Sequence, residues 1–220
     1  MIKAVNVHKT YQSLEVLKGV SLTIKEGEVV SIVGASGAGK TTLLQILGTL
    51  ETADKNKNAD LWIKDTQIMK LSDVELSAFR NQNIGFVFQF HQLLPEFSAL
   101  ENVCLPGYIA QRNKKEVEGE ALKLLDFLGV SHRIHHKPTA LSGGEQQRVA
   151  VARALINKPA VVFADEPSGN LDTASATLLH DLFFKLRDAF GHTFVIVTHN
   201  ETLANMADRK LVMKDGSILA

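Results

Sequence analysis

The sequence predicts an α/β fold in which helices cover both faces of a mostly parallel sheet. Residues 161–164 and 194–197 are unbroken apolar runs, which are typical of parallel strands buried on both faces. Helical patterns separate several of the apolar segments. Residues from about 100 to 155 have helical periodicity and no convincing strand. We interpret them as a helical insertion into the α/β core.

The expected strands are short apolar segments, and they span residues 20–24, 29–33, 85–88, 160–164 and 194–198. A helix is expected from residue 41 to 47. The charged helix that carries Leu125 is expected to end at Gly129, because glycine favours a helix C-terminus. Residues 54–60 are polar and predict an exposed loop. Residues 214–217 contain Asp-Gly and predict a tight hairpin.

The composition is that of an ordinary globular protein. The chain has 220 residues, 45% of them hydrophobic, with 24 Lys and Arg against 24 Asp and Glu and a single cysteine, Cys104. These values exclude a disordered or fibrous chain, and there is no basic block of the kind that binds nucleic acid. The N-terminus lacks the apolar stretch of a signal peptide, and no apolar run approaches the roughly 20 residues of a membrane span. We therefore expect a cytoplasmic protein with no direct membrane insertion and no nucleic-acid partner.

A phosphate-binding loop is the first chemical signal. Residues 34–41 match the pattern G-x-x-x-x-G-K-[ST] between an expected strand and an expected helix. Glycines let backbone N–H groups converge on an anion at the positive end of that helix. Lys40 is expected to reach the β and γ phosphates of a nucleotide, and the Thr41 hydroxyl to bind Mg²⁺. The candidate nucleotide contacts in this segment are Gly34, Ala35, Ser36, Gly37, Ala38, Gly39, Lys40, Thr41 and Thr42.

A pair of carboxylates follows the expected strand 160–164. At the end of a parallel strand beside a phosphate loop, Asp165 is expected to hold the Mg²⁺ coordination sphere. Glu166 is then free to orient an attacking water or to accept its proton. Acids just outside a strand are also commonly a solvated pair, and the nearby phosphate loop favours the catalytic interpretation.

A second anion-binding helix start lies in the helical insertion. Ser142 is a good helix N-cap residue, and Gly143 and Gly144 leave backbone N–H groups uncovered before a strong helix pattern. A single nucleotide does not need both sites from one chain.

Together these segments resemble the ABC ATPases. Leu-Ser-Gly-Gly-Glu at 141–145 looks like their signature motif, with the phosphate loop upstream and the carboxylate pair downstream. The resemblance covers essentially the whole chain. It implies a P-loop NTPase (RecA-like) core with a peripheral antiparallel β subdomain and an inserted α-helical subdomain. The implied single ABC ATPase domain spans 1–220, with its nucleotide-binding core at 1–88 and 158–220 and its helical signature subdomain at 89–157.

The same resemblance implies roles for further residues. Tyr11 lies where the family has an aromatic ring that stacks on adenine, although a lone Tyr near a terminus is usually structural. Gln89 matches the Gln that touches Mg²⁺ and the attacking water, and residues 168–172 match the loop that crosses the dimer interface. His199 matches the switch His that contacts the γ-phosphate. The implied catalytic residues are Glu166, His199, Gln89 and Lys40, and the implied Mg²⁺ ligands are Thr41, Gln89 and Asp165.

The resemblance also implies an assembly. The implied assembly is a homodimer that closes head to tail around ATP and Mg²⁺. Residues of one subunit would then complete the nucleotide site of the other, and they are Ser142, Gly143, Gly144 and Glu145. Integral membrane permease subunits are the other implied partners. They would hold the ATPase at the cytoplasmic face of the inner membrane as a peripheral subunit.

The segment 84–103 looks most like the LolD ATPases of lipoprotein release. The group around them also contains MacB-like efflux ATPases and FtsE-like ATPases that regulate cell-division or cell-wall enzymes, and both alternatives stay open. The chain ends soon after the hairpin at 214–217, which argues against the fused permease of full-length MacB. Signature-type ATPases of DNA repair usually carry a long coiled coil between the motifs. Only about 100 residues without heptads separate Lys40 from Ser142, which disfavours that class.

Overall fold

Strands and helices alternate along much of the chain, and the structure, a computed structural model, describes residues 1–54 and 57–219. The strands are β1 (Ile2–Tyr11), β2 (Leu14–Ile24), β3 (Val29–Val33), β4 (Asp60–Ile63), β5 (Thr66–Gln67), β6 (Ile84–Phe88), β7 (Val161–Asp165), β8 (Thr193–Val197), β9 (Arg209–Lys214) and β10 (Ser217–Leu219). The helices are α1 (Lys40–Leu47), α2 (Asp73–Asn83), α3 (Ala99–Ile109), α4 (Lys114–Phe127), α5 (Gly143–Leu155), α6 (Thr173–Phe190) and α7 (Glu201–Met206). Short 3₁₀ turns are η2 (Ile68–Lys70), η3 (Ser131–Arg133) and η4 (Pro138–Ala140).

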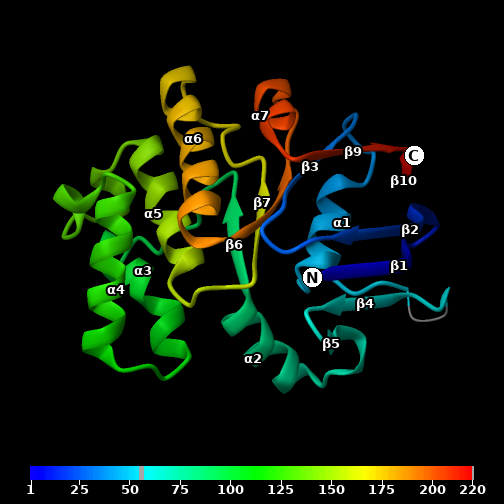
Figure 1. The fold of residues 1–220 in the computed structure, drawn as a ribbon, viewed down its shortest axis with the longest axis horizontal. Coiled ribbons are helices and arrows are strands. Elements are labelled where there is room, and N and C mark those ends of the chain that lie inside the picture. The colour runs from blue at the N-terminus through cyan, green and yellow to red at the C-terminus, as the bar shows by residue number, and fades with distance from the viewer. Residues whose placement is uncertain (55–56, 220) are drawn as a thin grey trace.

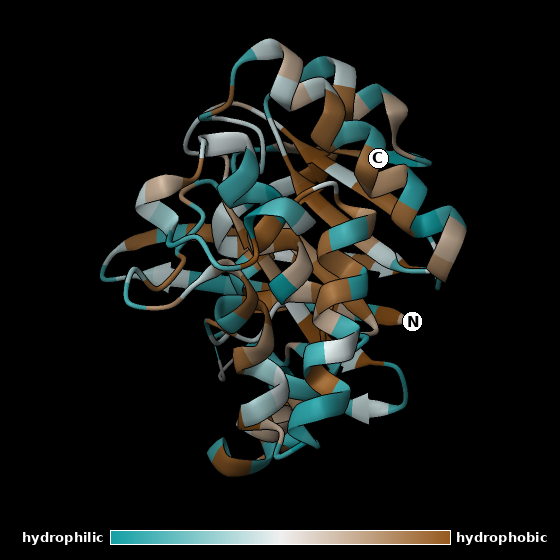
Figure 2. Cartoon of the chain, turned by 90° about the vertical axis from the view of Figure 1, so that its left-hand side faces the viewer, coloured by the Kyte–Doolittle hydropathy of each residue, from teal (hydrophilic) through white to brown (hydrophobic). Residues whose placement is uncertain are grey.

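The central sheet has the strand order β10-β9-β3-β8-β7-β6. Neighbours from β9 to β6 pair in parallel, and β10 adds an antiparallel edge. The apolar residues of β7 and β8 are buried, as their unbroken apolar runs predict. Figure 2 shows hydrophobic strands at the centre of the molecule and helices of mixed character around them. The predicted α/β fold with a mostly parallel sheet is confirmed.

A smaller antiparallel sheet, with the order β2-β1-β4-β5, lies at the opposite side of the molecule from α3, α4 and α5 (Figure 1). This confirms the expected antiparallel β part. The predicted loop 54–60 extends one residue too far, because Asp60 pairs with Val5 as the first residue of β4. Residues 55 and 56 of that predicted loop lie outside the described residues. The predicted hairpin is confirmed, with Asp215 and Gly216 at φ angles of 47° and 83° between β9 and β10.

The segment between β6 and β7 is helical, as predicted for residues from about 100 to 155. Ser98 and Ser142 cap the N-termini of α3 and α5, each accepting a hydrogen bond from the backbone N–H three residues on. After α4, Gly129 has a φ of 69°, so the predicted glycine stop is confirmed. In the described part of the chain, no helix is long and apolar enough to span a bilayer.

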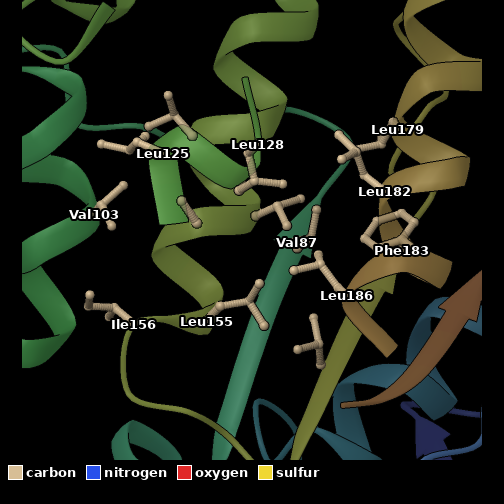
Figure 3. Packing of buried hydrophobic residues seen from close by; sticks show 14 of the residues in the cluster. Val87, Val103, Leu125, Leu128, Leu155, Ile156, Leu179, Leu182, Phe183 and Leu186 are labelled. Carbon is tan, nitrogen blue, oxygen red and sulfur yellow. The ribbon is translucent and has the colours of Figure 1, made fainter. Parts of the chain in front are cut away.

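The hydrophobic core lies on both faces of the central sheet, because alternate residues of each strand point to opposite sides. Phe194 and Ile196 of β8 belong to the cluster under α3 to α6, whereas Val195 and Val197 belong to the cluster with α1 and the smaller sheet. Figure 3 shows the first cluster, in which side chains of α4 and α5 meet those of β6 and α6. The two clusters fix the sheet between the helical part and the antiparallel part.

Candidate active site

The topology brings the predicted motifs to one edge of the central sheet. Strands β3, β8, β7 and β6 are parallel neighbours, so their carboxyl ends lie side by side. The phosphate loop follows β3, the segment with His199 follows β8, the carboxylate pair ends β7, and Gln89 follows β6. Such an edge is where ligands bind in open α/β sheets. Motifs far apart in the sequence therefore become neighbours.

The phosphate loop depends on glycine where the chain turns. Gly37 and Gly39 have φ angles of 79° and 96°, a region that side chains other than glycine's rarely adopt. Gly34 lies close to β9, and a Cβ added there would be 2.2 Å from the Met213 carbonyl oxygen. The loop ends at α1, whose first-turn N–H groups have no partner within the helix. A compact anion cradle results at a helix N-terminus.

Lys40 and Thr41 extend from this cradle. The Lys40 ammonium donates hydrogen bonds to the carbonyl oxygens of Gly34, at 2.8 Å, and Ala35, at 3.0 Å. The Thr41 hydroxyl donates to Asp165 Oδ1 at 3.2 Å. Burial raises the pKa of Asp165, and the bond from Thr41 opposes that rise. The paired hydroxyl and carboxylate oxygens are the hard ligands that Mg²⁺ prefers, so these residues fit that metal.

Glu166 and His199 form a close pair at the same edge. Glu166 Oε2 lies 2.8 Å from His199 Nδ1 and accepts a hydrogen bond from the His199 backbone N–H at 3.1 Å. The Glu166 side chain is only 17% exposed, whereas that of His199 is 71% exposed. Glu166 also has a φ of 46°, which is strained for a residue with a side chain. Backbone strain of this kind is concentrated at functional sites.

A cleft of about 650 Å³ joins these groups to the smaller sheet. Its lining residues come from the β1–β2 hairpin, the phosphate loop, α1, and the ends of β7 and β8; they are Tyr11, Leu14, Val16, Gly34, Ser36, Gly37, Gly39, Lys40, Thr41, Thr42, Glu166, Val197 and His199. Tyr11 is 40% exposed and lies at the apolar end of the cleft with Leu14 and Val16. The cleft therefore combines an aromatic, apolar end with an anion-binding end, as a nucleotide requires.

Other predicted contacts of the phosphate loop lie around this cleft without lining it. Ala35 is exposed, and Ala38 is only 5% exposed. Gln89 is turned toward the loop 168–172, where its Nε2 donates to Asn170 Oδ1 at 3.0 Å. Asn170 Nδ2 in turn donates to the Gln89 carbonyl oxygen at 3.3 Å. The pair links the end of β6 to the loop after β7.

The signature segment lies at the N-terminus of α5. Ser142 Oγ accepts from the Glu145 backbone N–H at 3.2 Å, and Glu145 Oε2 accepts from the Ser142 N–H at 2.7 Å. The other carboxylate oxygen accepts from Arg133 Nε at 2.9 Å. These contacts, with the Ser142 N–H bond the largest, lower the pKa of Glu145 to about 2. The charge of Glu145 is therefore engaged within the chain, and the exposed Ser142 and Gly143 remain to face a ligand.

The glycines of this segment differ in their surroundings. Gly143 is exposed, whereas Gly144 is buried against α6, where an added Cβ would lie 2.9 Å from Ser175 Oγ. Among the described residues, none from 142–145 lines the cleft of the phosphate loop. One chain does not bring the two predicted anion sites together.

Sequence reasoning missed several residues around the cleft. Leu14, Val16 and Val197 line it, and Glu51 accepts a hydrogen bond from the Tyr11 hydroxyl at 3.2 Å. Leu14 is 66% exposed at the hairpin, and its place three residues after Tyr11 was the one local signal in the sequence. Glu51 carried no local signal, because its partner is 40 residues away.

Comparison with known proteins agrees with this geometry. The sequence pattern described as ABC transporter matches residues 17–169, which include the phosphate loop, the signature segment and the carboxylate pair. The chain belongs to the ABC transporter family. The predicted resemblance to the ABC ATPases is confirmed.

Relatives within the ABC transporter family match along their whole length. The lipoprotein-releasing system ATP-binding protein LolD of Cytophaga hutchinsonii is 61% identical over 221 residues, covering 100% of this chain and 99% of the relative. The protein of the same name from Bacteroides thetaiotaomicron is 60% identical, with 99% of each chain covered. The dimeric, post-hydrolysis structure of the ATP-binding cassette MJ0796 bound to ADP and Pi has a TM-score of 0.90 and 40% identity, and covers 100% of this chain and 97% of its own.

Proposed function

We propose that this chain is the ATP-hydrolysing subunit of an ABC transporter that releases lipoproteins from the inner membrane through a separate permease. The observation that carries the proposal is the placement of Lys40, Glu166 and His199 around one cleft with an aromatic end. Relatives about 60% identical over their full length are named for a lipoprotein-releasing system, which supports the cargo class.

Four side chains of the cleft have tasks in ATP hydrolysis. Tyr11 stacks on the adenine, and the glycine-rich cradle binds the phosphates through its backbone N–H groups. Lys40 exchanges its bonds to the loop carbonyls for bonds to phosphate oxygens, and with His199 it stabilises charge on the γ-phosphate. Glu166 orients the attacking water and accepts its proton. This arrangement of positioned charge is most of what phosphoryl transfer needs.

Thr41 and Asp165 are the residues that would hold Mg²⁺, and Gln89, at the end of β6, would be a further ligand. When bound, the metal neutralises charge on the phosphates. Burial of Asp165 beside Thr41 keeps this carboxylate facing the phosphate loop. Gln89 must release Asn170 to reach the metal, which would couple the site to the loop 168–172.

A second copy of the chain supplies what one cleft lacks. Ser142 and Gly143 lie outside the cleft of their own chain, yet the exposed Ser142 hydroxyl and the Gly143 N–H lie at a helix start that suits an anion. A head-to-tail dimer places them against the γ-phosphate bound by the partner subunit. The solved cassette with 40% identity is a dimer, which supports this arrangement.

An apolar surface on the helical part suits the permease. Val74, which is 81% exposed, and Ile109, which is 70% exposed, line a groove between α2 and α3. Phe90, which is also 70% exposed, lies in the segment between β6 and α3. Exposed apolar residues that gather with a polar rim mark protein interfaces. Docking at this surface would hold the ATPase at the cytoplasmic face of the inner membrane.

Two experiments test the proposal. The purified protein should hydrolyse ATP when Mg²⁺ is present and stop when EDTA removes it; an equal rate in EDTA would refute the assigned chemistry. In the cell, affinity purification from membranes should recover an integral membrane permease of a lipoprotein-releasing system. Recovery of a division complex instead would favour the FtsE-like alternative.

The docking surface has a matched test. Phe90→Glu should lower permease recovery at least about tenfold, since it places a charge in an apolar contact. Phe190→Glu changes an aromatic residue that is 54% exposed at the end of α6, and should leave recovery unchanged. If the wild type, Phe90→Glu and Phe190→Glu recovered equal amounts of permease, the permease would dock on another surface.

A further inference from the structure

Tyr11 is held by a set of contacts that the hydrolysis mechanism does not use. Its hydroxyl donates to Glu51 Oε2 at 3.2 Å, and Lys9 Nζ lies over its ring, 5.0 Å from the ring centroid. Lys9 Nζ also donates to Glu51 Oε1 at 2.9 Å and to the Thr52 carbonyl oxygen at 2.8 Å. The Lys9 side chain is 12% exposed and that of Glu51 is 31% exposed, so this ion pair is partly shielded from water.

Glu51 is itself fixed to the helix that follows the phosphate loop. Its backbone N–H donates to the carbonyl oxygen of Gln45 in α1 at 3.2 Å. Its carboxylate also accepts from the Thr52 N–H at 2.7 Å, which holds the side chain in one orientation. These contacts form a short path from α1 through Glu51 to the Tyr11 ring on β1. Hydrogen bonding to Lys9 lowers the pKa of Glu51, so the carboxylate is charged at neutral pH.

We propose that Glu51 is a positioning residue that fixes the Tyr11 ring relative to the phosphate loop, so that adenine and triphosphate are bound in one geometry. The inference rests on the proposed function, because it needs a nucleotide in the cleft. Lys9 covers one face of the ring and leaves the opposite face for the base. Since Tyr11 is 40% exposed on a hairpin, its ring would otherwise sample several rotamers.

The test compares ATP with inorganic triphosphate, which keeps the three phosphates and lacks the base. Glu51→Ala should raise the Kd for ATP about fivefold, the equivalent of one lost hydrogen bond. It should leave the Kd for inorganic triphosphate unchanged. Glu51→Gln keeps an acceptor for the Tyr11 hydroxyl and should recover part of the affinity. Glu15→Ala is the matched control, because Glu15 is a carboxylate on the same sheet that is paired with His8 instead.

A double-mutant cycle separates positioning from general damage. Tyr11→Phe keeps the ring but removes the hydroxyl, so adding Glu51→Ala to it should weaken ATP binding less than Glu51→Ala does in the wild type. Fully additive effects, or equal losses for ATP and inorganic triphosphate, would overturn the inference. If the wild-type protein bound inorganic triphosphate and ATP with the same affinity, adenine stacking and the inference would both be wrong. If the wild-type protein bound neither ATP nor inorganic triphosphate, the proposed function would be refuted instead.

Discussion

The acid sensitivity of Glu145 gives a quantitative check on the signature segment. Contacts with Ser142 and Arg133 hold its pKa at about 2, against an ordinary 4.5. Because the folded pKa is the lower one, the stabilisation is complete well above pH 4.5 and is lost as pH falls toward 2. The difference between about 2 and 4.5 corresponds to about 3.4 kcal/mol. Solvent screening of the side chain, which is 12% exposed, reduces this to about 2 to 3 kcal/mol.

The perturbation is Glu145→Gln, which keeps the shape of the side chain and removes its charge. Urea unfolding at pH 7 should show the variant less stable by about 2 to 3 kcal/mol. Of the stabilisation of about 3.4 kcal/mol before screening, about 0.8 kcal/mol is lost by pH 4 and about 2 kcal/mol by pH 3. The wild-type and variant curves should therefore converge as the pH falls. A stability difference that is constant between pH 7 and pH 4, or absent at pH 7, would refute the assignment of this charge to the helix start.

Other predictions concern packing. Leu125→Ala should cost about 3 kcal/mol in urea unfolding, because Leu125 is fully buried between α4 and its neighbours, whereas Leu122→Ala, at a position 41% exposed, should change stability by less than about 0.5 kcal/mol. Similar costs at both positions would contradict the described packing of α4. Gly85→Ala should destabilise by about 1 to 3 kcal/mol, because the added Cβ would lie 2.4 Å from the Ala154 carbonyl oxygen. Gly119→Ala, in open space on α4, should instead be neutral or stabilise by up to about 1 kcal/mol; thermal and urea unfolding distinguish the two glycines.

Local signals in the sequence were enough to place β3, β6, β7 and β8 of the central sheet and the motifs at their ends. The phosphate loop, the carboxylate pair and His199 each follow a strand with a clear apolar pattern, and parallel pairing gathers the carboxyl ends of these strands at one edge. Ser142 and Gly129 were predictable for the same reason, because helix caps depend on neighbours within a few residues. The phosphate loop and the residues around Glu166 are thus encoded by short stretches of chain.

Long-range contacts and irregular strands were not predictable in this way. Strand β1 has register shifts near Asn6, which has a φ of 52°, and these interrupt the alternation that would have identified it. Asp60 read as a loop residue, yet its carboxylate accepts hydrogen bonds from Trp62 and Gln67 within the smaller sheet. Glu51 meets Tyr11 only after the chain has passed through α1. Such contacts come from tertiary packing, on which local composition carries no information.

The most direct test of the central claim is the oligomeric state of Glu166→Gln with ATP and Mg²⁺, measured by sedimentation velocity beside the hydrolysis rate. We predict an ATP-dependent dimer and hydrolysis at least about 100-fold slower than in the wild type, because the variant binds ATP but lacks the base. A variant that stayed monomeric with ATP, or that hydrolysed it at nearly the wild-type rate, would contradict the account.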